Sequence, residues 1–189
     1  LHCNQPDIVL QGSSTTPSSL SFVWSTTNGQ IVSGSTTPQP TVDAAGAYSL
    51  TVTNLSNGCT AVDQVAITQV MPPDFTPSAV QPNCLQPKGR IDFGPVANGE
   101  APFMYSINSG QTFMSSPAFN SLASGDYLLV VEDAYGCTAD AAVSLQTPLI
   151  PTVTLPEIVT IDLGENIQLT PLLNIPIAQV ASWQWTPPD

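Results

Sequence analysis

One segment of this chain occurs twice, and the repeat constrains the fold more than any other feature. Residues 45–63 run through a Gly-x-Tyr step, an alternating stretch and a Gly-Cys pair, and residues 124–140 follow the same order. Tyr127 stands 79 residues after Tyr48. A period of this length indicates tandem domains of similar structure, each built around the same strand and turn.

The repeat divides the chain into three parts. We expect one domain over residues 1–71, a second over 72–148 and the first half of a third over 149–189. Pro72 and Pro148 mark short, stiff linkers between them. The third part begins like the other two, but neither the Tyr nor the Gly-Cys pair follows in it.

The local pattern predicts strands and almost no helix. Nineteen prolines and twelve glycines interrupt the chain every few residues. Polar and apolar side chains alternate over residues 47–53, 63–68 and 151–155, and residues 158–169 suggest two strands joined around Gly164. The predicted fold class is therefore all-β, with tandem immunoglobulin-like antiparallel β-sandwiches of which the third is incomplete.

Composition excludes several classes of partner. Lys and Arg total 2 and Asp and Glu total 14, so the formal net charge is −12. Nucleic-acid binding needs clustered basic side chains to neutralise phosphates, so we expect no nucleic-acid partner. An anionic membrane surface is disfavoured for the same reason. The chain contains no apolar run near the roughly 18 to 20 residues that span a bilayer, so we expect no membrane insertion.

Four cysteines allow three disulfide pairings. The repeat selects Cys3–Cys59 and Cys84–Cys137, each inside its own domain, and each would contribute on the order of 4 kcal/mol through loop closure. A metal site lacks ligands, because the chain has one histidine and no Cys-x-x-Cys pair. We therefore expect structural disulfides, no cofactor, and a secreted, extracellular or cell-surface location.

Four aromatic residues are predicted to build the cores, and a fifth to face a partner. Tyr48 and Tyr127 occupy the same place in both copies, which is typical of a buried ring whose hydroxyl satisfies a backbone group. Trp24 and Trp185 match the core tryptophan of a sandwich. Trp183 alternates with Trp185 and is a candidate for contact with a glycan or a neighbouring chain.

The sequence offers little for catalysis, and we predict that the chain is not an enzyme. The one histidine, His2, lies at the N-terminus and is a poor candidate for a general base, and no serine stands in a Gly-x-Ser-x-Gly elbow. Asp126, Asp133 and Asp140 cluster near the second Gly-Cys pair and are weak candidates for a Ca²⁺ site. Their spacing is not that of a calcium loop, and solvated turn residues are the more ordinary interpretation.

The second domain resembles the SprB-type repeat. The resemblance is carried by Cys84, Gly89–Ile91, residues 101–110 (APFMYSINSG), Gly125–Tyr127 and residues 133–137 (DAYGC). The first domain, with Trp24, Gly46–Tyr48 and Asn57–Thr60, is similar to the PKD-like, immunoglobulin-like repeats of the same secreted proteins. The third part, with Leu163–Glu165 and Trp183–Pro188, resembles the opening half of such a repeat.

SprB-type repeats build long surface adhesins of gliding Bacteroidota. The resemblance implies export across the outer membrane, for which the type IX route is the candidate, and a non-catalytic structural or adhesive role in a surface fibre. Expected partners are other copies of the chain, neighbouring domains of a longer chain, or surface polysaccharide, and strand addition would complete the half domain. The alternative is a carbohydrate-binding or spacer region of a secreted hydrolase, with Phe103, Tyr105, Tyr135 and Trp183 as sugar platforms.

Overall fold

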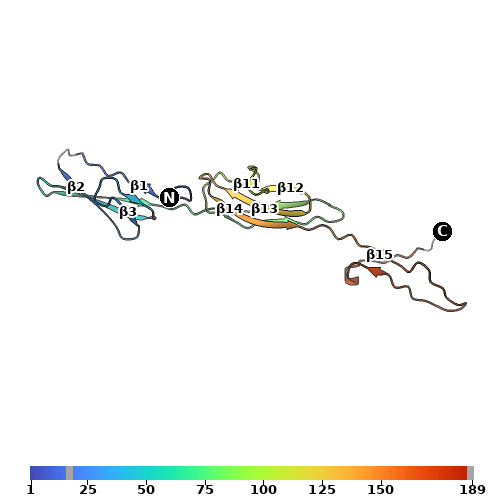
Figure 1. Ribbon diagram of the computed structural model, residues 1–189. Coiled ribbons are helices and arrows are strands. Elements are labelled where there is room, and N and C mark those ends of the chain that lie inside the picture. The colour runs from blue at the N-terminus through green and yellow to red at the C-terminus, as the bar shows by residue number, and fades with distance from the viewer. Residues whose placement is uncertain (16–18, 187–189) are drawn as a thin grey trace.

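The two sandwiches lie end to end, and the third part continues beyond the second (Figure 1). The computed structural model describes residues 1–15 and 19–186. Within these residues sixteen strands form, and the helical content is the 3₁₀ turn η1 (Ile177–Gln179). No helix in the described ranges combines the length and hydrophobicity that a bilayer crossing requires. The predicted all-β architecture of immunoglobulin-like sandwiches is confirmed.

The first sandwich, unit 1, consists of two three-stranded antiparallel sheets in residues 1–71. One sheet has the order β2-β5-β6 and the other β1-β4-β3. The strands are β1 (Ile8–Val9), β2 (Leu20–Thr26), β3 (Ile31–Ser33), β4 (Thr41–Val42), β5 (Gly46–Asn54) and β6 (Thr60–Ile67). Alternation along β5 directs Tyr48 and Leu50 inward, as the sequence pattern predicts.

The core of unit 1 is built from both sheets. Its buried apolar residues are Leu10, Trp24, Val42, Tyr48 and Leu50. The predicted core role of Trp24 is confirmed, since the side chain is 7% exposed and its Nε1–H donates to the Thr37 carbonyl at 3.1 Å. The Tyr48 hydroxyl donates to the Ala44 carbonyl at 2.6 Å and accepts from the Gln30 N–H, as expected of a corner tyrosine.

The second sandwich, unit 2, has the same plan with additional edge strands. Its sheets have the orders β11-β13-β14, β12-β9-β8 and β10-β7. The strands are β7 (Asp74–Phe75), β8 (Ser78–Val80), β9 (Gly89–Asp92), β10 (Val96–Ala97), β11 (Met104–Ser106), β12 (Ala118–Leu122), β13 (Gly125–Glu132) and β14 (Thr138–Leu145). Within the described residues, no strand pairing crosses Pro72.

The core of unit 2 is centred on Phe93. Its ring packs against three other aromatic rings, those of Phe75, Tyr105 and Phe119, at centroid distances of 5.1 to 5.8 Å. Tyr127 packs against this core, and its hydroxyl donates to the Ala123 carbonyl at 2.8 Å. The predicted corner role of Tyr127 is therefore confirmed, although this ring is less buried than that of Tyr48.

The third part, over the described residues 149–186, has little regular structure. β15 (Val153–Thr154) pairs with β16 (Leu172–Leu173) over two residues. The two strands expected around Gly164 do not form there. Because a strand pair is stable only when one face is covered, and these side chains are exposed, the alternating pattern alone does not produce a sheet.

The predicted core role of Trp185 is wrong. Trp185 is 54% exposed and lies outside any strand. Trp24 is covered because two sheets close around it, whereas no second sheet faces Trp185 in the described residues.

Candidate functional site

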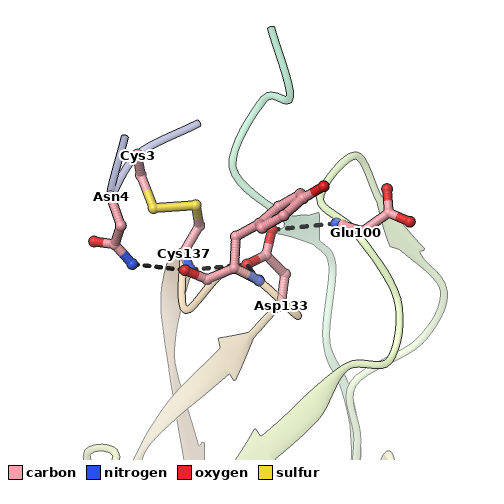
Figure 2. The surroundings of a disulfide bond; sticks show 6 residues. Cys3, Asn4, Glu100, Asp133 and Cys137 are labelled. Carbon is pink, nitrogen blue, oxygen red and sulfur yellow. Dashed lines mark hydrogen bonds between the residues drawn. A yellow bond between two sulfur atoms is a disulfide. The ribbon is translucent and has the colours of Figure 1, made fainter. Parts of the chain in front are cut away.

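A disulfide between Cys3 and Cys137 joins the two sandwiches (Figure 2). Cys3 lies in the turn before β1 of unit 1, and Cys137 lies in the turn between β13 and β14 of unit 2. The bond spans 134 residues of sequence. The predicted pairs Cys3–Cys59 and Cys84–Cys137 are therefore wrong, and Cys59 and Cys84 are free and exposed.

The strand layout explains why Cys3 does not pair with Cys59. The N-terminal NH₃⁺ of Leu1 donates to the Thr68 carbonyl, so the Cys3 turn lies at the end of unit 1 where β6 ends. Cys59 precedes β6 and lies at the opposite end of that strand. Eight strand residues span roughly 26 Å, whereas a disulfide needs Cα atoms within about 7 Å. A repeat in register fits pairing between units as well as pairing within one.

Side chains of unit 1 contact the Cys137 turn of unit 2 around the disulfide. The Asn4 side-chain amide donates to the Tyr135 carbonyl at 2.7 Å. The His2 ring stacks on the Tyr135 ring with centroids 4.3 Å apart and planes 12° apart. A Cβ on Gly136 would lie 3.0 Å from Asn4 Nδ2, so the unit 1 turn lies directly against the backbone of the unit 2 turn.

Asp133 holds the unit 2 side of the junction in shape. Its carboxylate is 4% exposed and accepts three backbone N–H groups: from Tyr135 at 2.9 Å, Cys137 at 2.8 Å and Glu100 at 3.2 Å. Figure 2 shows Asp133 between the disulfide and the Glu100 loop. A carboxylate with three backbone donors fixes the turn that carries Cys137.

The two units are attached at a second place. The chain itself passes from Met71 to Pro72, and the Met71 carbonyl accepts the Gly99 N–H at 2.9 Å. The Leu1 carbonyl accepts the Val70 N–H at 2.8 Å, which ties the N-terminal segment to the linker. Peptide linker and disulfide therefore fix unit 1 to unit 2 at two points, and two points of attachment restrict hinge motion far more than one.

The structure does not bring the calcium candidates together. Asp126 and Asp133 lie at opposite ends of β13, and Asp140 lies exposed on β14. Among the described residues, the one group of three or more close metal-ligand side chains is His2, Cys3 and Cys137, and its two sulfur atoms are bonded to each other. Asp133 is a turn residue whose carboxylate oxygens accept backbone N–H groups, so the three acids do not form the weak candidate Ca²⁺ site.

One carboxyl group has a clearly shifted pKa. The backbone N–H of Gly94 and the Arg90 guanidinium both donate to Asp92 and hold the pKa of that carboxyl below its usual range. Arg90 and Asp92 approach to 2.7 Å with partly exposed side chains. A lowered pKa keeps Asp92 ionised at neutral pH, so this group forms a surface ion pair and is poorly suited to general acid catalysis.

The sugar-platform candidates are spread over different environments. Tyr105 is buried and Phe103 packs against the core of unit 2, so neither presents a free ring face. The Tyr135 ring is stacked on His2. Trp183 is 46% exposed and remains available to a ligand or a partner.

Sequence reasoning missed the junction contacts of His2, Asn4, Glu100 and Tyr135. A usable signal was present in the Cys-x-Gln-Pro tetrapeptide, which occurs at Cys3–Pro6 and again at residues 84–87. The repeated tetrapeptide marks the turn that presents the cysteine.

Comparison with known proteins places the chain in no family. No family model matches it, and no curated protein matches it. Among solved structures, it is similar to the three N-terminal domains of the bacteriophage RB49 Highly Immunogenic Outer Capsid protein (Hoc), with a TM-score of 0.48 and 16% identity over 88% of this chain. It is also similar to the amphioxus IgVJ-C2 molecule, with a TM-score of 0.36 and 11% identity over 78% of this chain and 100% of that chain. The chain spans 63% of the Hoc structure.

Proposed function

We propose that this chain is a non-catalytic, extracellular structural or adhesive module of a bacterial surface fibre or long repeat adhesin of the SprB type. The observation that carries the proposal is the Cys3–Cys137 bond across the junction of two sandwiches. A structural disulfide needs an oxidising compartment, which supports an extracellular location. The fold and the junction support a mechanical role, since they fix the spacing and orientation of consecutive units.

The disulfide also changes the path of tension along the chain. A force that enters at residue 1 reaches Cys3, crosses to Cys137 through the sulfur atoms and continues towards residue 189. Residues 4–136 lie outside this path. Unit 1 beyond Cys3 and unit 2 up to Cys137 are thereby protected from extension, which is a useful property in a surface fibre.

Single-molecule force spectroscopy on the whole chain, held at its two ends, tests this role. With the disulfide intact, we expect the extension at full unfolding to fall short of the reduced chain by roughly 450 Å, since an extended residue spans about 3.3–3.6 Å and the two cysteines are separated by 134 positions in sequence. The Cys3→Ser variant should extend fully without reductant. The matched Cys59→Ser variant, which removes an exposed free thiol, should behave as wild type. Full extension of the unreduced wild type contradicts the proposal.

A second candidate function, glycan binding, rests on the exposure of Trp183. Tryptophan faces bind sugar rings, and this side chain is 46% exposed in the third part. A glycan array with wild type and Trp183→Ala tests it, with Leu163→Ala as a control for removal of an exposed apolar side chain from the same part. Binding that is lost in Trp183→Ala alone supports the glycan role, and no binding by wild type removes it.

A further inference from the structure

The unit 1 half of the junction occurs a second time in the chain. Cys3 and Cys84 each stand five residues before the next strand along the chain, β1 after Cys3 and β9 after Cys84. Both turns close with the same backbone hydrogen bond, from His2 N to the Gln5 carbonyl at 3.2 Å and from Asn83 N to the Gln86 carbonyl at 2.8 Å. In unit 2 this turn faces solvent, and its Cys84 thiol is free. Unit 2 therefore carries an unused copy of the docking turn.

The unit 2 half of the junction also occurs twice. The Cys59 carbonyl accepts the Asn54 N–H at 2.9 Å, as the Cys137 carbonyl accepts the Asp133 N–H at 2.9 Å. Gly58 and Gly136 share a φ of 74°. A Cβ on Gly136 would meet Asn4, whereas a Cβ on Gly58 would meet nothing within 4 Å. Unit 1 therefore carries an open copy of the receiving turn.

A groove on unit 1 lies beside this open turn. It has a volume of about 620 Å³ and lies between residues 10–15, which follow β1, and residues 59–65 of the β6 edge. Trp24 and Leu50 form part of its floor. In the described part of the chain, β4 is the one strand that pairs with β1, and every residue of β6 from Thr60 to Ala66 is exposed.

In unit 2, β7 and β8 occupy the place that corresponds to the unit 1 groove. β8 pairs with β9 and lies against β14, β7 pairs with β10, and the Phe75 ring stacks on Phe93 at 5.3 Å. These strands belong to the segment 72–82, which enters from the end of unit 1. Unit 1 thus supplies unit 2 with the cysteine turn that carries Cys3 and with edge strands from the segment 72–82. Unit 1 itself has an open receiving turn at Cys59 and a groove beside β6, which could accept the same two elements from another unit.

The end of unit 2 that lies away from unit 1 also carries a cysteine turn, at Cys84, and a segment that follows its last strand, β14. Gln81 and Gln146 bond to each other beside the last residues of β14, so the Cys84 turn and residues after 145 leave from one end. Residues 149–161 follow β14 as 72–82 follow β6. Large apolar side chains in this segment are exposed: Ile150 at 70%, Val153 at 62% and Ile158 at 85%.

Charge also favours a contact between these two ends. The two basic residues of the chain, Lys88 and Arg90, both lie within six residues of Cys84. Residues 1–71 contain Asp7, Asp43 and Asp63 and no Lys or Arg. Arg90 is paired with Asp92, so Lys88 is the basic side chain that the Cys84 end of unit 2 presents to an acidic unit 1.

We infer that unit 1 of one copy binds unit 2 of a second copy, head to tail, and repeats the junction within the chain. Cys59 of one copy bonds to Cys84 of the other, and residues 149–161 lie in the groove beside β6 as an added edge strand. The contact is heterologous and does not close on itself, so it produces a filament. This inference deepens the proposed function and rests on it.

The covalent step requires a disulfide oxidant such as glutathione disulfide. The Cys84 thiolate attacks it and releases one glutathione, and the Cys59 thiolate of the second copy then displaces the other. One protein disulfide forms and the oxidant is reduced to two glutathione thiols, which carry the two electrons and two protons of the protein thiols.

Two variants, each with one free cysteine replaced by serine, test the inference directly. The full chain at high concentration, oxidised with glutathione disulfide, should give a ladder of oligomers on non-reducing gels. Cys59→Ser alone and Cys84→Ser alone should each remain monomeric. An equimolar mixture of the two should give a dimer and nothing longer, linked by a Cys59–Cys84 peptide in mass spectrometry. Both positions are exposed, so serine leaves the fold intact.

A matched pair of valine substitutions separates docking from random thiol pairing. Val62 lines the groove and is 63% exposed, whereas Val32 is 54% exposed and lies outside it. Each valine variant is made in the Cys84→Ser background and mixed with Cys59→Ser. Val62→Asp should then slow dimer formation at least tenfold, and Val32→Asp should leave the rate unchanged.

Three results would overturn the inference: a wild type that stays monomeric with glutathione adducts on both thiols, frequent Cys59–Cys59 or Cys84–Cys84 links, or equal rates for the two valine variants. The force measurement on single chains does not depend on polymerisation. A stiff monomer that fails to polymerise therefore removes this inference alone.

Discussion

At the scale of single residues, Tyr48 and Tyr127 occupy the same position in the repeat, but their hydroxyl groups contribute differently to the free energy of unfolding. The Tyr48 hydroxyl is fully buried and bonded to Ala44 and Gln30, whereas the Tyr127 hydroxyl has one bond and is partly solvated. Tyr48→Phe should lower the free energy of unfolding by about 1–2 kcal/mol, and Tyr127→Phe by less than about 1 kcal/mol. Hydrogen exchange of the β5 and β13 amides measures both, and equal losses would contradict this account.

Asp133 carries a second prediction at this scale. Asp133→Ala leaves three backbone N–H groups without their acceptor in a buried turn, so we expect a loss of about 2–3 kcal/mol in urea unfolding. The control Asp126→Ala removes an exposed carboxylate and should change stability by less than about 0.5 kcal/mol. Adding Ca²⁺ should leave the Tm of wild type unchanged, because these acids form no common site.

At the scale of elements, the Gly-Cys turns permit a matched test of the junction. Gly58 and Gly136 have the same positive φ, so alanine costs each turn a similar backbone strain of about 1 kcal/mol. The added Cβ meets Asn4 at Gly136 and open space at Gly58. Gly136→Ala should therefore speed reduction of Cys3–Cys137 by a small thiol, and Gly58→Ala should not. Equal reduction rates would show that the turns are not in contact.

The elements that could be predicted from sequence are those with a local signal. Strands β5 and β13 follow from alternation around Tyr48 and Tyr127, and the core roles of these residues follow from their recurrence. The disulfide partner of Cys3 could not be predicted in this way, because identical repeats look the same whether a bond stays within a unit or joins two. Only the position of each turn at one end of the sandwich decides between them.

The strand and core predictions for the third part are wrong for a related reason. Alternation over residues 158–169 and the Trp183–Trp185 pattern describe strands that need a covering sheet, and pattern alone does not supply one. Trp24 shows the contrast, since the same kind of pattern in unit 1 is packed between two sheets.

At the scale of the whole molecule, the two attachments between the units predict a narrow range of orientations. Reduction of Cys3–Cys137, or the Cys3→Ser variant, leaves the Met71–Pro72 linker and the weaker contacts of His2 and Asn4. Small-angle scattering should then show a broader distribution of distances between units than in the oxidised chain. An unchanged scattering profile would indicate that the disulfide does not set the orientation.

The disulfide joins neighbouring units and not the two ends of one unit. The most direct test is peptide mapping of the unreduced monomer after free thiols are alkylated. Pepsin at acid pH suits this, because thiol exchange is suppressed there and the chain has too few basic residues for trypsin to separate the cysteines. We predict one linked pair containing Cys3 and Cys137, with Cys59 and Cys84 alkylated. Linked pairs Cys3–Cys59 and Cys84–Cys137 would contradict the account.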